Sequence, residues 1–146
     1  RGYLTESKVF VEGALQLIQT LAPQYDLHIT SNGLADTQMK RLKVTGLAPY
    51  FKGIFVSENT GFQKPMNQFF NDVFDHIPNF DLNKAMIIGD SYSADIIGGT
   101  GAGIDTCWFN PLYIAPPQNV VPTYEISRLD QLLSILKNEK HLKSTV

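Results

Sequence analysis

Helical and extended patterns alternate along this sequence from one end to the other, and this alternation restricts the possible folds more than any other feature. Short apolar runs suited to strands are separated by segments of about ten residues in which apolar side chains recur at helical spacing. Strands separated by helices pair in parallel through right-handed crossovers. The sequence therefore predicts an α/β domain, with helices on both faces of a Rossmann-like parallel sheet in three layers.

Glycine, proline and the apolar periodicity set the limits of the predicted elements. Residues 85–88 form a continuous apolar run, which is typical of a strand covered on both faces. Residues 57–64 and the proline-rich stretch 110–122 are predicted to be loops. The predicted strands are 27–30, 54–56, 85–88, 106–109 and 124–126, and the predicted helices are 11–21, 36–44, 65–77, 94–102 and 129–136.

Charge and cysteine content exclude several classes of function. Twelve Lys and Arg against fourteen Asp and Glu leave a net charge of -2, which argues against an electrostatic grip on nucleic acid or on an anionic membrane. No apolar run approaches the roughly 20 residues that a membrane-spanning helix needs. The single cysteine, Cys107, cannot form an internal disulfide, which favours a reducing, cytoplasmic location. We therefore expect a small molecule as the partner.

Polar residues follow the predicted strands at the edge where ligands bind in parallel sheets. Ser31, Asn32 and Gly33 come directly after one strand, and Lys64 precedes the helix after the next. A serine hydroxyl and backbone N–H groups at a helix start can donate to phosphate oxygens, and a lysine adds a positive charge. Taken one by one, the Ser-Asn-Gly sequence can be a simple turn and Lys64 a solvated loop lysine.

Two carboxylates follow the strand 85–88. Asp90 comes after Gly89, and Asp95 lies five residues on, in the first turn of the next predicted helix. Carboxylate oxygens are ligands that Mg²⁺ prefers, and phosphate and water complete its octahedron. Asp90 can alternatively cap the helix, and Asp95 can simply complement the helix dipole. The four groups together, in this order, predict a site for a phosphate beside a divalent metal ion.

These segments resemble the motifs of a known family. Residues 27–33, 61–65 and 89–99 are similar to motifs two, three and four of the haloacid dehalogenase-like (HAD) hydrolase superfamily. The resemblance extends over about residues 11–111. Within the superfamily, residues 103–110 resemble the fifth-strand region of the pyrimidine 5'-nucleotidase subgroup.

The resemblance implies a magnesium-dependent phosphatase that works through a phospho-aspartate. It implies that Ser31 contacts the transferring phosphoryl group and that Lys64 balances charge between this group and the nucleophile. Asp90 would bind Mg²⁺, with Asp95 as a further ligand or as a support for a metal-bound water. Ser31, Lys64 and Asp90 are thus the expected catalytic residues, and a nucleoside 5'-monophosphate is the expected substrate.

Motif one of the superfamily is absent. It is a strand that ends in Asp-x-Asp and carries the nucleophile, and this sequence has no Asp-x-Asp. The family's helical cap is also missing, so residues 1–8 are interpreted as the end of a cap or linker. Residues 9–137 are then a partial core domain, and 138–146 form a solvated tail. We expect the missing strand to leave an open position between the strands 27–30 and 85–88.

The incomplete motif set leaves several functions open. We expect the chain to be the C-terminal part of a longer enzyme that also supplies the nucleophile, and to be inactive alone. The alternatives are a phosphatase acting on sugar- or glycolate-type phosphates, a dehalogenase, and a non-catalytic phosphate-binding or interaction fragment. His28 and Cys107 lie within apolar runs and are interpreted as core residues, without a role in catalysis.

Overall fold

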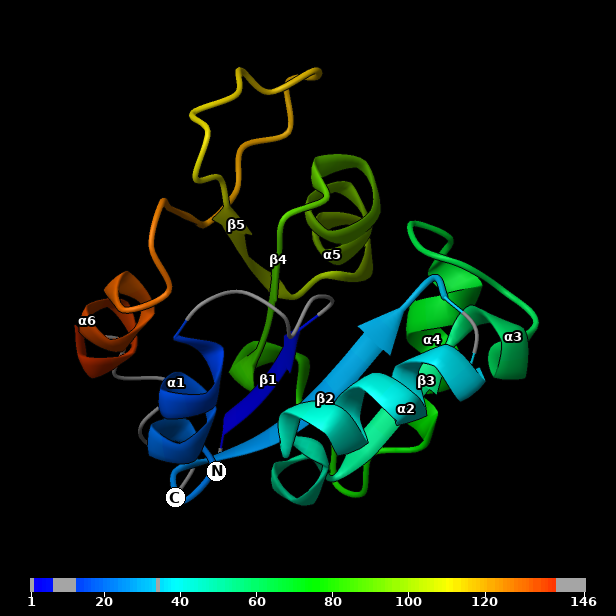
Figure 1. The fold of residues 1–146 in the computed structure, drawn as a ribbon. Coiled ribbons are helices and arrows are strands. Elements are labelled where there is room, and N and C mark those ends of the chain that lie inside the picture. The colour runs from blue at the N-terminus through cyan, green and yellow to red at the C-terminus, as the bar shows by residue number, and fades with distance from the viewer. Residues whose placement is uncertain (1, 7–12, 34, 139–146) are drawn as a thin grey trace.

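The computed structural model describes residues 2–6, 13–33 and 35–138, and within them a parallel sheet of six strands forms the centre of the protein (Figure 1). The strand order is β3-β2-β1-β4-β5-β6, and every neighbouring pair is parallel. The fold class expected from the alternating pattern is therefore confirmed. The strands are β1 Gly2–Glu6, β2 Tyr25–Ser31, β3 Gly53–Val56, β4 Ala85–Gly89, β5 Asp105–Phe109 and β6 Tyr124–Ile126.

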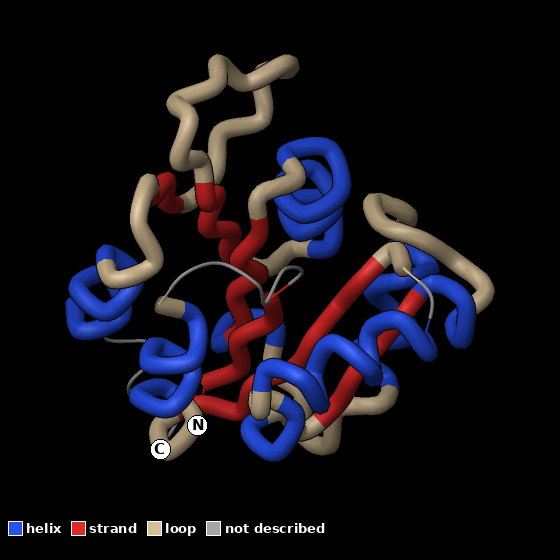
Figure 2. The backbone as a smooth tube through the Cα atoms, viewed as in Figure 1, coloured by secondary structure: helices blue, strands red, loops and turns tan. Residues whose placement is uncertain are grey.

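Helices cover both faces of this sheet, which produces the predicted three layers (Figure 2). α1 and α6 pack on one face, and α4 and α5 pack on the other. The α-helices are α1 Ala14–Leu21, α2 Ala35–Thr45, α3 Ser57–Thr60, α4 Asn67–Asp75, α5 Ile97–Ala102 and α6 Gln131–Asn138. Short turns of other helical types are η1 Ala48–Tyr50, η2 Leu82–Lys84 and η3 Tyr92–Ile96, the last of these a π-helical turn.

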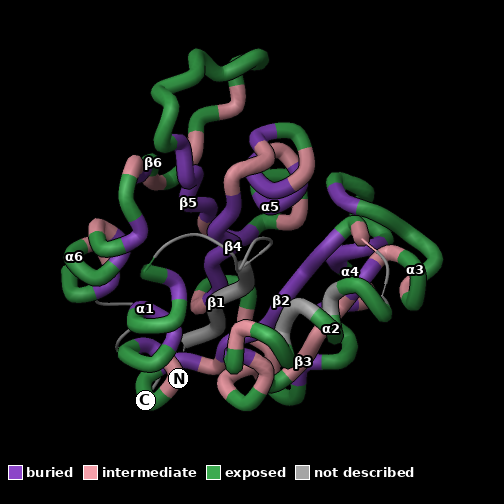
Figure 3. Tube along the Cα trace, in the orientation of Figure 1, coloured by how far each residue is buried: buried purple, intermediate pink, exposed green. Residues whose placement is uncertain are grey.

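Strand β4 contributes to the cores on both sides of the sheet. Met86 and Ile88 pack with the α1 and α6 side, while Ala85 and Ile87 pack with the α4 side. All residues of β4 are buried (Figure 3). This alternation explains why its sequence is continuously apolar, as predicted for a strand with no solvent-facing side.

The expected open position in the sheet is wrong for this structure. β1, Gly2–Glu6, lies between β2 and β4 and pairs in parallel with both. Residues 1–8 were expected to lie outside the core as the end of a cap or linker. An open position would leave the backbone N–H and C=O groups of two inner strands unpaired, which is costly. Pairing by an extended segment removes this cost.

Other differences from the expected elements are local. The loop predicted at 57–64 begins with the short helix α3, and the helix predicted at 94–102 begins earlier, with the π-helical turn η3. Parts of the predicted first helix and of the C-terminal tail fall in 7–12 and 139–146, outside the described residues. Among the residues that the structure describes, none of the helices has both the length and the apolar character needed to cross a membrane.

Candidate active site

Ser31 and Asp90 stand level with each other at the carboxyl edge of the sheet. Glu6 of β1 is paired with Ile29 on β2 and with Ile88 on β4, so Ser31 and Asp90 each lie two residues beyond a partner of Glu6. With one strand between them, their backbones are about 10 Å apart. Parallel pairing thus brings the predicted phosphate-binding and metal-binding segments to one edge.

Lys64 is buried, with 4% of its surface exposed, although it is a lysine in a loop. Its Nζ lies 2.7 Å from Oδ1 of Asp95 and donates a 3.1 Å hydrogen bond to the backbone carbonyl of Thr30. The side chains of Lys64 and Asp95 are 2% and 0% exposed. A buried cation needs a partner of opposite charge. The ion pair and the bond to Thr30 therefore fix the ammonium group beside the residue that precedes Ser31.

Ser31 is buried and its hydroxyl oxygen accepts a 3.0 Å hydrogen bond from the backbone N–H of Gly33. This N–H was expected to be free for a phosphate, and it is instead occupied. The bond uses a lone pair of the hydroxyl oxygen and not its proton.

Asn32 was expected to offer a backbone N–H to a phosphate, and its side chain makes contacts that the sequence did not predict. Its side-chain Oδ1 accepts from the backbone N–H of Lys64 at 2.8 Å, and its Nδ2 donates to the carbonyl of the same residue at 3.0 Å. Both ends of the amide are thus bonded to the loop that carries the lysine. No feature of the sequence pointed to this contact between distant segments.

Asp95 and Asp90 have different surroundings although they are only five residues apart, Asp90 directly after β4 and Asp95 in η3. Asp95 is fully buried, and besides Lys64 its carboxylate accepts a 3.3 Å hydrogen bond from the backbone N–H of Ser91. Asp90 is half-buried, and its backbone carbonyl accepts a 3.1 Å hydrogen bond from the indole of Trp108. Asp95 is therefore held mainly within the protein, while Asp90 lies closer to solvent.

A small apolar cluster supports the segment from Asp90 to Asp95. Tyr92, Ile96 and Trp108 are buried together, and the rings of Tyr92 and Trp108 meet edge to face at 5.1 Å. The Tyr92 hydroxyl lies within hydrogen-bonding distance of the carbonyls of Gln118 and Val120, so it holds the long loop after β5. Sequence reasoning missed this support. The only indication in the sequence was an aromatic residue, Tyr92, between Asp90 and Asp95.

Two glycines let helix α5 approach the sheet closely. A Cβ on Gly98 would lie 2.7 Å from the ring of Phe70 and 3.1 Å from Cα of Pro65. A Cβ on Gly99 would lie 2.6 Å from the side chain of Ile87. These distances leave no room for a methyl group. Gly98 thus brings the segment after Asp95 against the segment after Lys64, and Gly99 brings it against β4 of the sheet.

The donor set fits a magnesium ion that takes most of its ligands from substrate and water. Within the described ranges, no group of three or more His, Cys, Asp or Glu side chains is arranged to hold a metal ion. Mg²⁺ commonly binds through one or two carboxylates together with phosphate oxygens and water. Of the two aspartates, Asp95 has its carboxylate engaged by Lys64, whereas Asp90 is half-buried directly after β4.

The other titratable core residues lie apart from these groups. Burial lowers the pKa of His28, an effect that the charge of Asp26 partly offsets, and His28 packs beside the ring of Phe55. Burial raises the pKa of the Cys107 thiol to about 12. A thiol with this pKa stays protonated at neutral pH and is a poor nucleophile.

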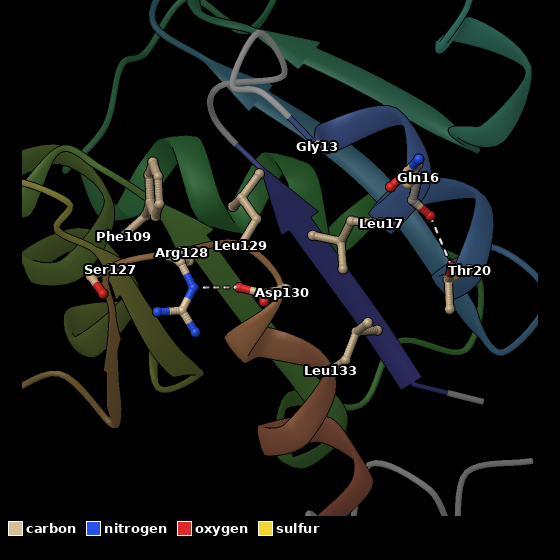
Figure 4. A pocket seen from close by; sticks show the side chains of 10 residues that line it. All are labelled: Gly13, Gln16, Leu17, Thr20, Phe109, Ser127, Arg128, Leu129, Asp130 and Leu133. Atoms are coloured by element: carbon tan, nitrogen blue, oxygen red, sulfur yellow. Dashed lines mark hydrogen bonds and ion pairs between the residues drawn. The ribbon is translucent and has the colours of Figure 1, made fainter.

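Among the cavities at the surface of the described residues, one lies beside the candidate site and another lies apart from it. One of about 460 Å³ adjoins the site: Asn32 and Gly33 line it together with residues of α3 and of the loop before Lys64. The other, of about 500 Å³, lies between α1 and α6, with the exposed ion pair of Arg128 and Asp130 at its rim (Figure 4). The second cavity contains none of the predicted site residues.

Comparison with known proteins agrees with the fold. The sequence profile of the family "Haloacid dehalogenase-like hydrolase" matches residues 4–109. The HAD-hydrolase YfnB of Bacillus subtilis is 51% identical over 95% of this chain, which spans 59% of YfnB. The crystal structure of YfnB, which is bound to magnesium and reveals interdomain movement, aligns with a TM-score of 0.85 over 86% of this chain and 55% of its own.

Two further relatives differ in activity. The pyrimidine 5'-nucleotidase PynA of Streptococcus pneumoniae is 39% identical over 92% of this chain and 57% of its own length. The crystal structure of a 2-haloacid dehalogenase of Pseudomonas syringae has a TM-score of 0.76 at 31% identity, over 89% of this chain and 54% of its own. The chain thus spans little more than half the length of these relatives. From its sequence profile, its fold and its relatives, the chain belongs to the haloacid dehalogenase-like hydrolase family.

Proposed function

We propose that these residues are the phosphate- and metal-binding part of a magnesium-dependent phosphomonoesterase. The observation that carries the proposal is the buried pair of Lys64 and Asp95, which holds a cation next to Ser31 at the sheet edge that also carries Asp90. A fixed cation and an aligned hydroxyl stabilise the charge that builds up on a transferring phosphoryl group.

Each residue has a distinct role in this proposal. Ser31 donates a hydrogen bond to a phosphoryl oxygen, and Lys64 neutralises charge between that group and an attacking carboxylate. Asp90 holds Mg²⁺, with Asp95 as the group that keeps the ammonium group of Lys64 in place. Bound magnesium would neutralise negative charge on the phosphoryl oxygens.

The nucleophile has to come from outside these 146 residues, because the sequence contains no Asp-x-Asp. In the whole protein, a carboxylate attacks phosphorus and the bond to the alcohol oxygen of the substrate breaks. Water then hydrolyses the acyl phosphate, which releases phosphate and regenerates the carboxylate. The 146 residues alone would bind phosphate without turnover.

A nucleoside 5'-monophosphate is the proposed substrate. The likeness to the pyrimidine 5'-nucleotidase PynA supports this choice. A sugar- or glycolate-type phosphate is the second candidate, since the same phosphate-binding residues serve any monoester. A dehalogenase is a weaker alternative: the P. syringae relative favours it, while a half-buried carboxylate at Asp90 is suited to a metal ion that dehalogenation does not require.

The test is phosphate release by the whole protein from a panel of nucleoside, sugar and glycolate monophosphates, with Mg²⁺ and with a chelator. We expect turnover that needs Mg²⁺, with the highest kcat/KM for a nucleoside monophosphate. The 146-residue chain, assayed in parallel, is expected to release no phosphate. Halide release from a 2-haloacid without phosphate release, or turnover that is unaffected by the chelator, would reject the proposal.

A further inference from the structure

The side chain of Asn32 joins two segments that are 32 positions apart in the chain. Its Oδ1 accepts from the N–H of Lys64 at 2.8 Å, and its Nδ2 donates to the carbonyl of Lys64 at 3.0 Å. A side-chain amide that bonds both backbone groups of a single residue fixes the position and the direction of that residue. Asn32 therefore restrains the backbone from which the lysine side chain extends.

The other end of the lysine is held by the same strand. Nζ of Lys64 donates to the carbonyl of Thr30 at 3.1 Å, and Thr30 lies two residues before Asn32. The end of β2 thus holds Lys64 at its backbone and at its ammonium group, with Ser31 between the two attachment points.

Lys64 uses only part of the hydrogen-bonding capacity of the Asn32 amide. The side chain has one carbonyl oxygen and an NH₂ group with two N–H donors, and Lys64 engages the oxygen and one N–H. Positioning of Lys64 and contact with a phosphate therefore have to be separated by experiment. The exposure of Asn32 places it at the rim of the site, where it can act on the lysine without contacting substrate.

We propose that Asn32 is a positioning residue that sets the place of Lys64, and is not itself a phosphate ligand; this rests on the proposed phosphatase function. Asp95 holds the ammonium group of Lys64 through opposite charge. Asn32 fixes the backbone position of Lys64, which the ion pair alone does not. A displacement of about 1 Å in a catalytic group can lower turnover by about 100-fold. Loss of the Asn32 bonds lowers kcat more than it raises KM.

The test compares Asn32→Ala, Asn32→Asp and the control Asn71→Ala in the whole protein. Asn71 is exposed on α4. We expect Asn32→Ala to lower kcat about 10- to 100-fold with KM changed less than about threefold. Asn32→Asp keeps an acceptor for the N–H of Lys64 and is expected to retain more activity than Asn32→Ala. A phosphate-contact role predicts the reverse order, because a carboxylate repels phosphate.

Amide hydrogen exchange at Lys64, measured without substrate, is the second readout. The N–H of Lys64 is bonded to Asn32, so its exchange is expected to become at least about tenfold faster in Asn32→Ala. Asn32→Asp and Asn71→Ala are expected to leave it protected, and Asn32→Asp also carries the test if Asn32→Ala does not fold. Unchanged exchange in Asn32→Ala, or a kcat/KM of Asn32→Asp below that of Asn32→Ala, overturns the proposal. If the whole protein hydrolyses no phosphomonoester, the proposed function fails, and the exchange at Lys64 alone then decides the role of Asn32.

Discussion

Asp90 and Asp95 are only five residues apart, the first directly after β4 and the second in η3, yet they are buried to different extents. Asp95 is fully buried and its Oδ1 lies 2.7 Å from Nζ of Lys64. Asp90 is half-buried at the end of β4, where Trp108 holds its backbone. A buried, paired carboxylate serves mainly to place its partner, whereas one near solvent can exchange water for a metal ion. The comparison predicts that substitutions at the two positions separate stability from activity.

The largest expected effect is loss of activity in Asp90→Asn. Removing the charge of the proposed metal ligand should lower kcat/KM of the whole protein by at least about 10³-fold. The free energy of unfolding without metal should change by less than about 1 kcal/mol, because the side chain is half-buried. Phosphate-release kinetics and urea unfolding measure the two quantities. Full activity in this variant would show that Asp90 does not bind an essential metal.

The next effect concerns the buried pair. Lys64→Met leaves the carboxylate of Asp95 buried without its cation, and should lower the free energy of unfolding by about 3–5 kcal/mol. In the double variant Lys64→Met/Asp95→Asn the stranded charge is gone. This double variant should regain at least about 1 kcal/mol relative to Lys64→Met alone. The measurement is denaturant unfolding of Lys64→Met, Asp95→Asn and the double variant. If the stability losses of the two single variants simply add up in the double variant, the residues are not a coupled pair.

The close packing of α5 against Pro65, Phe70 and β4 can be tested at its glycines. Gly98→Ala and Gly99→Ala should each cost about 1–3 kcal/mol in stability, because a methyl group at either position overlaps its neighbours. Gly98→Ala should also lower kcat, since it displaces Pro65 next to Lys64. Gly101→Ala is the control: its nearest atom would be 3.5 Å away, and a helical alanine should be neutral or stabilising by up to about 1 kcal/mol. Equal stability of all three variants would contradict the close packing.

The smallest expected effect is a pH dependence at His28, away from the site. Burial lowers the pKa of His28 from its ordinary value of 6.5, so the unfolded chain takes up this proton first as the pH falls. Above pH 6.5 His28 is neutral in both states and burying it costs no stability through its charge. As the pH falls from 6.5 toward the folded-state pKa, protonation of His28 in the unfolded chain lowers the free energy of unfolding. His28→Gln should lose less stability than the wild type between neutral and mildly acidic pH in urea unfolding. An unchanged pH dependence in this variant would mean that His28 is not held neutral by the core.

Much of the fold could be predicted from local patterns. The strand at 124–126 is found as predicted, and the apolar run 85–88 is the buried core of β4. Both follow from side-chain periodicity and burial, which short stretches of sequence encode. The position of β1 could not be predicted this way, because Gly2–Glu6 has no strong apolar pattern and its place depends on the two strands it joins.

The positions of the candidate site residues along the strands could be predicted better than the contacts between their side chains. Ser31, Lys64, Asp90 and Asp95 were expected at one edge of the sheet, and the parallel topology places the segments that carry them there. The bond from Asn32 to the backbone of Lys64 depends on tertiary contact between distant segments. The same holds for the ion pair of Lys64 with Asp95, which no spacing rule reveals.

The most direct test of the account is the effect of Mg²⁺ on phosphate binding, measured by calorimetry with inorganic phosphate and the whole protein. The account predicts that Mg²⁺ raises the affinity of the wild type for phosphate at least about tenfold, because a bound ion and phosphate attract each other. It also predicts that this increase disappears in Asp90→Asn, while phosphate binding without Mg²⁺ stays similar in the two proteins. An equal increase in both proteins, or no effect of Mg²⁺ on the wild type, would contradict the assignment of Asp90 as the metal ligand.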